Sequence, residues 1–281
     1  MGDHYIPRHY LKGFTEEGQN SVWVYDKIET KTFRASTEKV AQEIGFYSRK
    51  VEEYLANKIE SPANAVIKKV RERQLVAPDE KLLLSNYMMV MYKRVPAGKQ
   101  KFREMAPGVA DSLMKRYGEA LDDMMLSDGV DVALIARRRK DIEEILAQFA
   151  SAPPEGIWLD ILNPEQTPRS VEAMARMTWC FFTRDQDPLF LSSDNPVFFP
   201  SSMGLGHRDS ELCFPLSSTV ALWGTWRKDL KESYIPADSQ VAKELNRRTA
   251  SKASRYVFHC KNETWVMPFI KKKGYSLNRI T

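Results

Sequence analysis

Hydrophobic residues recur with two different spacings along this chain, one typical of strands and one typical of helices. The positions at which the spacing changes divide the sequence into three parts. Alternation in Ser21–Tyr25 and Thr30–Phe33, on either side of a polar stretch, predicts a β-hairpin near the start. Apolar residues then recur every three or four positions through residues 51–150, which predicts helices. Short apolar runs rich in β-branched and aromatic residues occupy residues 157–281 and predict strands.

This order of elements predicts an α+β fold. We expect a single domain over residues 1–281, with a helical insertion at about 51–150 and a β-rich C-terminal part at about 157–281. The N-terminal hairpin and the C-terminal part would form a mixed or antiparallel sheet around the large helical middle.

Several boundaries within the helical region can be predicted. Residues 37–45 fit a brief helix that ends at Gly45, and Ser61 followed by Pro62 predicts an N-cap and the first turn of a new helix. Glu80–Arg94 is apolar on nearly all sides, which is typical of a buried central helix. Residues 99–125 and 130–150 continue the helical pattern.

The C-terminal part combines strands with one helix, predicted at residues 239–253. The predicted strands are Ile157–Leu159, Met177–Phe182, Leu189–Leu191, Val197–Phe199, Leu212–Leu216, Val220–Trp223, Tyr256–Cys260 and Thr264–Met267.

Composition narrows the class of protein. The chain has 42 Lys+Arg against 37 Asp+Glu, and this net charge of +5 permits a nucleic-acid partner without requiring one. Its three cysteines are far apart in apolar surroundings, which predicts buried thiols. No stretch approaches the roughly 20 apolar residues of a membrane span, and the start lacks a signal peptide. We therefore expect a cytoplasmic protein with no membrane partner, of unknown oligomeric state.

The stretch HYIPRHYLKGF combines acid–base and anion-binding side chains. His4 and His9 can each act as general base, general acid or metal ligand near neutral pH. Arg8 offers a planar fork that suits phosphate or carboxylate. The alternative is that the aromatic residues of this stretch anchor the N-terminus and the histidines bond locally. For His4 and Arg8 together, both interpretations stay open.

A second polar stretch follows the apolar run Leu189–Leu191. It places Asp194 and Asn195 at the end of a predicted strand, where loops carry many binding and catalytic groups. Asp194 could bind a metal or orient a histidine. An Asx turn before Pro196 is the competing interpretation.

These motifs resemble those of a known family. The matching residues are His4-Tyr5-Ile6-Pro7-Arg8 with Tyr10-Leu11, Glu43 with Phe46-Tyr47, Glu53, Glu60, Ser193-Asp194-Asn195-Pro196, Asn246, Ala253 and Tyr256. On them the chain resembles, nearly end to end, the uncharacterised bacterial domain-of-unknown-function family numbered 4238. The resemblance implies that the two ends of the chain meet. By analogy with members found among phage-defence genes in mobile elements, it also implies a defence role.

The first functional hypothesis is a metal-assisted nuclease or another phosphodiester hydrolase. Glu43 and Asp194 would hold Mg²⁺ or Mn²⁺. His4 would be general base or ligand, and Arg8 would stabilise the phosphate charge. Nucleic acid or a phage component would be the partner, and the substrate-binding residues would be His9, Tyr10, Tyr47, Asn195 and Asn246.

The alternative hypothesis is a non-catalytic sensor or binding protein whose polar cluster is structural. In that case Arg8 and the neighbouring tyrosines would form a hydrogen-bond network, and a surface around Trp223 and Trp226 would meet a partner. The sequence contains no GxxxxGK[ST], GxGxxG, GxSxG, HExxH or Cys–His zinc pattern. P-loop NTPases, dinucleotide dehydrogenases, α/β-hydrolases, HExxH metalloproteases and zinc fingers therefore lose their main support.

Overall fold

The computed structural model describes residues 2–46, 48–127, 129–154, 158, 169–200, 203–272 and 279–280. The chain forms two compact units, the first from Met1–Pro96 with Pro164–Thr281 and the second from Ala97–Asn163. The fold is α+β, as the sequence predicts. The sequence pattern places the start of the helical insertion at about residue 51. The second unit starts at Ala97, so the helices between residues 51 and 96 belong to the first unit.

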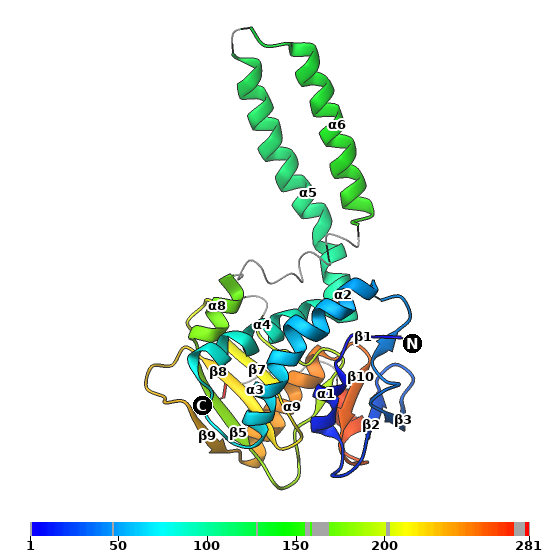
Figure 1. Cartoon of the computed structure of the whole chain (residues 1–281), viewed down its shortest axis with the longest axis vertical. Coiled ribbons are helices and arrows are strands. Elements are labelled where there is room, and N and C mark those ends of the chain that lie inside the picture. Colours follow the sequence, from blue (N-terminus) through cyan, green and yellow to red (C-terminus); the bar gives the residue numbers. More distant parts are fainter. Residues whose placement is uncertain are drawn as a thin grey trace. The chain divides into compact units, whose positions relative to one another are not determined.

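One sheet of the first unit joins segments that are far apart in the sequence. Its hairpin confirms the predicted N-terminal pair, and Val257 and Phe258 lie opposite Tyr25 and Val24 in antiparallel register. The implied meeting of the N-terminal and C-terminal parts of the chain is therefore confirmed for two strands, one from each part, which lie side by side (Figure 1). The strand order is β3 (Lys31–Ser36), β2 (Ser21–Asp26), β10 (Tyr256–His259) and β6 (Ser192–Ser193).

A second sheet is mixed, because its edge strand β9 runs parallel to β5 whereas the other pairs are antiparallel. Its order is β7 (Glu211–Pro215), β8 (Val220–Thr225), β5 (Thr178–Thr183) and β9 (Ser233–Pro236). A two-stranded ladder pairs β1 (Asp3–His4) with β4 (Gln42–Glu43).

Helix α9 (Ser239–Lys252) links the cores of the two larger sheets. Ala242 and Leu245 pack in a cluster with Cys180 and Trp223 of the mixed sheet. One turn later, Ala250 packs in the other cluster with residues of β2 and β10. The remaining elements of the first unit are α1 (Arg8–Leu11), η1 (Lys12–Phe14), α2 (Arg49–Tyr54), η2 (Leu55–Glu60), α3 (Ser61–Arg71), α4 (Pro78–Arg94), α8 (Arg169–Arg176) and α10 (Val266–Ile270).

Helix α4 is buried on several sides, which confirms the prediction of a central helix. Leu84, Tyr87 and Met88 have almost no exposed surface. Pro78 stands in the first turn, and Glu80 accepts from the Ala77 backbone N–H, so the helix begins where its pattern predicts. Its last residue, Arg94, is buried as well, although it carries a charge.

Some predicted boundaries are wrong. Residues 37–45 form turns and β4 in place of a brief helix, because Tyr5 donates its N–H to Ala41, whose φ is +55°. Ser61 caps no helix: α2 continues through the π-helical η2 into α3. Thr264–Met267 contributes to α10 rather than to a strand. The prediction at Ile157–Leu159 lies outside the described residues apart from Trp158.

The second unit is a helical hairpin of α5 (Pro96–Met125) and α6 (Val132–Ser151), which run antiparallel (Figure 1). Phe102 and Phe149 meet edge to face between the two helices, with ring centroids 6.4 Å apart. Within the described length of these helices, no segment has the length and hydropathy of a membrane span, and the same holds for the described helices of the first unit.

Candidate functional site

The N-terminal segment is anchored by its aromatic residues. The Tyr10 ring stacks on Phe214 with centroids 5.2 Å apart. Its hydroxyl donates to the Pro215 carbonyl at 2.7 Å and lies 2.8 Å from the Ser192 hydroxyl. Tyr10 is fully buried, so it holds α1 against β7 and contacts no solvent-filled space.

Arg71 completes this anchor from the end of α3. Its guanidinium donates to the carbonyls of Leu216 at 2.9 Å, His9 at 3.2 Å and Tyr10 at 2.9 Å. These bonds satisfy carbonyls in the short α1 and in the loop after β7. The polar face of the N-terminal segment is thereby turned toward α2, η2 and α4.

On that face lies a cavity of about 430 Å³, which we call the N-terminal pocket. It combines three segments: the start of the chain, the α2–η2 helix and the last turn of α4. The wide π turn supplies part of the wall, and such turns are frequent at functional sites. The lining residues are His4, Pro7, Arg8, His9, Lys12, Glu52, Ala56, Glu60 and Arg94.

Two histidines of the pocket are held neutral by burial. Desolvation lowers the pKa of His9 to about 4, despite Glu60, whose carboxylate lies 3.8 Å from Nδ1. The His9 Nε2 is 3.2 Å from the Tyr87 hydroxyl. Burial also lowers the pKa of His4, opposed by the hydrogen bond between its Nε2 and the Glu38 carbonyl at 3.2 Å. A neutral imidazole can accept a proton.

Glu52 titrates in the opposite direction. Desolvation, followed by a hydrogen bond with the Asp3 carboxyl, raises the pKa of Glu52 to about 7. Arg94 and the His4 backbone N–H oppose this shift. Near neutral pH, the Glu52 carboxyl can therefore both hold and release a proton, which is the property of a general acid–base group.

Arg94, at the end of α4, contacts both of the other segments that line the pocket. Its guanidinium pairs with the Glu60 carboxylate and donates to the His4 carbonyl. The Arg94 residue is only 2% exposed, so its charge needs these partners. At the open side Arg8 pairs with Glu38, with 43% of its side chain exposed, and Lys12 is exposed too. Arg8, Lys12 and Arg94 thus line the same pocket as the two histidines and Glu52.

Asp194 belongs to a different place, the end of β6. One carboxylate oxygen accepts the Ser254 N–H at 2.8 Å, and the other accepts those of Arg255 at 2.7 Å and Tyr256 at 2.9 Å. The residue is 4% exposed, and burial raises its pKa against the effect of these bonds. This geometry ties β6 to β10.

The other predicted site residues are distributed over the first unit. Glu43 is exposed on β4, opposite Asp3 in the ladder. Asn246 is buried in α9, where it accepts the Leu191 N–H at 2.8 Å and donates to the Leu189 carbonyl at 2.9 Å. Asn195 donates to the Lys252 carbonyl at 3.2 Å. Tyr47 lies outside the described residues.

The structure therefore brings His4, Arg8 and His9 together in one pocket, while Asp194, Asn195 and Asn246 hold the strands around α9. Across the described ranges, no three His, Cys, Asp or Glu side chains are grouped so that they could hold a metal ion. Trp223, expected at a partner surface, is 2% exposed and donates to Glu211 at 3.0 Å.

The site predicted from the sequence lacks Glu52, Glu60 and Arg94, although Glu60 is among the residues that carry the family resemblance. A signal for two of them exists, because Glu52, Ala56 and Glu60 recur at intervals of four and therefore share one face of a helix. Nothing in the local pattern pairs this face with Arg94, which ends a helix 34 residues later than Glu60.

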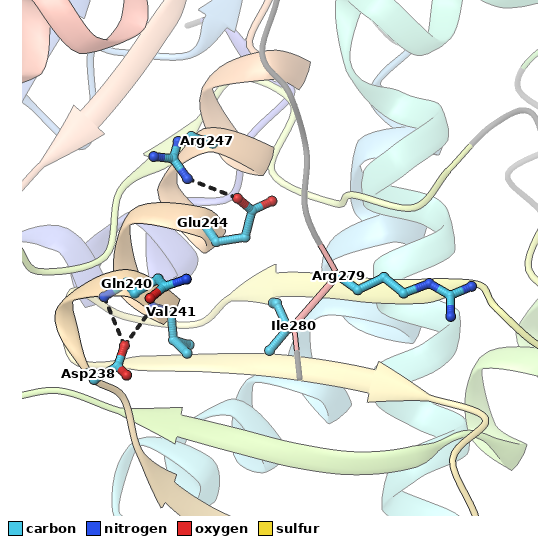
Figure 2. A pocket seen from close by; sticks show the side chains of 7 residues that line it. All are labelled: Asp238, Gln240, Val241, Glu244, Arg247, Arg279 and Ile280. Atoms are coloured by element: carbon cyan, nitrogen blue, oxygen red, sulfur yellow. Dashed lines mark hydrogen bonds and ion pairs between the residues drawn. The ribbon is translucent and has the colours of Figure 1, made fainter.

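Two other cavities have different chemistry. One of about 480 Å³ has an apolar wall that includes Trp265 and Phe269. The other, of about 140 Å³, lies at the start of α9, where Arg247 bonds to Glu244 and Asp238 accepts backbone N–H groups (Figure 2).

Comparison with protein-family models matches residues 3–263 to the family described as "Protein of unknown function (DUF4238)". The resemblance seen in the motifs is thereby confirmed. Neither a search of curated proteins nor a search of solved structures returned a match.

Proposed function

Because the chain belongs to the DUF4238 family of proteins of unknown function, we propose its activity from the N-terminal pocket itself: the hydrolysis of a phosphodiester. The observation that carries the proposal is that His4, His9 and Glu52 line one pocket together with three basic side chains. Such a combination of titratable and cationic groups in one concave place is typical of a catalytic site.

The cationic groups suit an anionic substrate. Arg8 and Lys12 are exposed, so a phosphate can reach them, and the buried Arg94 lines the same pocket as the partner of Glu60. Guanidinium groups bind phosphate oxygens in a bidentate manner and stabilise the charge that grows on them in the transition state. Arg8 would exchange its exposed partner Glu38 for the substrate.

The titratable groups supply the proton transfers. Hydrolysis needs a base that takes a proton from the attacking water and an acid that gives one to the leaving oxygen. Neutral His4 fits the first role, and protonated Glu52 fits the second, with its proton shared with Asp3. After release of both products, His4 returns its proton to solvent and Glu52 regains one.

A divalent cation, Mg²⁺ or Mn²⁺, remains part of the proposal. Asp194 and Glu43 were its predicted ligands, and both Asp194 oxygens already accept backbone N–H groups. We therefore propose that the cation enters bound to the substrate phosphate and takes few ligands from the protein, rather than occupying a site built only from protein side chains. Nucleic acid is the substrate class we propose, in a defence role against phage.

The test is turnover of labelled single- and double-stranded oligonucleotides and of a bis(aryl) phosphate, with Mg²⁺, with Mn²⁺ and with a chelator. Glu52→Gln should lower turnover by at least about 100-fold, the usual contribution of a general acid. Glu53→Gln is the matched control, since Glu53 is exposed on the same helix and pairs with Arg49. Activity should fall as the pH rises through about 7, because Glu52 loses its proton there.

Equal activity of Glu52→Gln and Glu53→Gln would refute the assigned role. If no substrate is turned over under any of the cation conditions, that result would support the alternative function of a non-catalytic binding protein. The structural roles of Asp194 and Asn246 favour the same alternative. Arg8→Ala should then weaken binding of the same oligonucleotides. In cells, loss of phage resistance in Glu52→Gln alone would support the defence role.

A further inference from the structure

The exposed apolar side chains of this protein gather on the helical hairpin. Among the described residues, fifteen large hydrophobic side chains are exposed, and nine of them belong to the second unit. Six of the nine lie toward the end where α5 passes to α6, and we call them the tip patch. The tip patch consists of Tyr117, Met124, Met125, Leu126, Val132 and Leu134.

The hairpin has little core of its own to explain these residues. The buried residues of α5 and α6 are Ala106, Ala110, Ile135 and Leu146, and two of these are alanines. Leu126 is 86% exposed, and Met124, Val132 and Leu134 each exceed 50%. An exposed apolar cluster rimmed by charged residues marks a place where another surface binds.

Charges along the hairpin indicate which surface that is. Acidic residues cluster near the tip, and a basic band, Arg137–Lys140, lies about 8 to 12 Å from the start of α6 at 1.5 Å per residue. Asp122 of the acidic group already pairs with Arg139 of the basic band inside the chain. The acidic group consists of Glu119, Asp122, Asp123 and Asp131.

We propose that the tip patch binds the tip patch of a second copy of this chain, with the two hairpins antiparallel and their tips overlapping. Each acidic group then faces the basic band of the other copy. The interface is closed by a two-fold axis, so one patch serves both partners.

The distances of the charged residues from the tip agree with this arrangement. With an overlap of about 15 Å, or ten residues, Glu119 of one copy comes within about one residue of the height of Arg137 of the other, and Asp123 reaches the height of Lys140. At the same overlap Tyr117 meets the apolar residues at the partner's tip.

The test measures the mass of the full-length protein by sedimentation velocity between about 1 and 200 µM, the range in which such modest interfaces assemble. The native protein should form a concentration-dependent dimer. Arg137→Glu with Arg138→Glu should remain monomeric, and so should Glu119→Lys with Asp123→Lys. An equimolar mixture of these two double variants should restore a dimer, because the reversed charges match again.

Controls separate the interface from the fold. Lys228→Glu with Lys231→Glu reverses two exposed charges of the first unit and should leave the dimer unchanged. Met124→Ser with Leu126→Ser should weaken dimerisation at least about tenfold, since it removes apolar area without altering charge. Circular dichroism should show unchanged helix content in all variants. A native monomer at the highest concentration, or a mixture that stays monomeric, would overturn the proposal.

Discussion

At the scale of single residues, buried charges in the first unit act mainly as connectors. Asp194 holds three consecutive backbone N–H groups of the turn before β10. Arg71 does the same for three carbonyls around α1. In both cases one side chain satisfies backbone groups that no ladder reaches, and an unsatisfied buried group would cost about 1 to 3 kcal/mol. These two charged side chains connect backbone segments, whereas the charged side chains of the N-terminal pocket line a cavity.

Asp194→Ala should therefore destabilise the protein by about 3 kcal/mol, because three buried N–H groups lose their acceptor. Urea denaturation of the two proteins measures the difference. Asp185→Ala is the control: Asp185 pairs with Arg73 on the surface, so its loss should cost less than about 1 kcal/mol. Unchanged stability of Asp194→Ala would speak for a functional rather than a structural carboxylate.

At the scale of elements, α9 is the helix that holds the first unit together, and its start depends on one cap. Asp238 accepts the backbone N–H groups of Gln240 and Val241, each at 2.8 Å (Figure 2). Along the helix, Leu245 packs on the mixed sheet and Ala250 on the other sheet. Loosening of its first turn therefore affects the core on the side of the mixed sheet first.

Asp238→Ala should lower the free energy of unfolding by about 1 kcal/mol, the usual worth of an N-cap. Asp238→Asn should retain most of it, since the amide oxygen can accept the same N–H groups. Thermal and urea denaturation of the three proteins check this. Equal losses in the two variants would show that the charge, and not the capping bond, stabilises the helix.

At the scale of the whole molecule, the two units differ in how much apolar surface they bury. The first contains two sheets and the buried helix α4, whereas few residues of α5 and α6 are buried. Regions with few buried contacts open at lower free energy than packed cores. The hairpin should thus behave as a separate, weaker cooperative unit.

Backbone amides in the middle of α5 and α6 should exchange with deuterium at least about tenfold faster than those of α4. Mass spectrometry of peptides from 110–124 and 134–148 against 82–92 measures this. If the proposed dimer forms, protection of the tip should rise with protein concentration while α4 stays constant. Equal protection of the hairpin and α4 in the monomer would contradict the division into units.

The sequence by itself determined what depends on local periodicity. The alternation in Ser21–Tyr25 and the apolar pattern of Glu80–Arg94 predict β2 and α4, because each element needs only its own side-chain spacing to define a buried face. The number of histidine, arginine and tyrosine side chains in the HYIPRHYL stretch likewise predicts a site, and His4, Arg8 and His9 of this stretch line the N-terminal pocket.

Only the tertiary structure decided how distant residues converge. Residues 37–45 have a helical pattern, yet pairing of β4 with β1 overrides it, because a short helix is marginal without packing of its own. Glu52 acquires its raised pKa from burial and from Asp3, and neither is visible in its neighbours along the chain. Asp194, for which the sequence leaves a metal ligand and a turn residue open, accepts N–H groups of a turn 60 residues away. Such contacts depend on three-dimensional proximity, which local spacing does not encode.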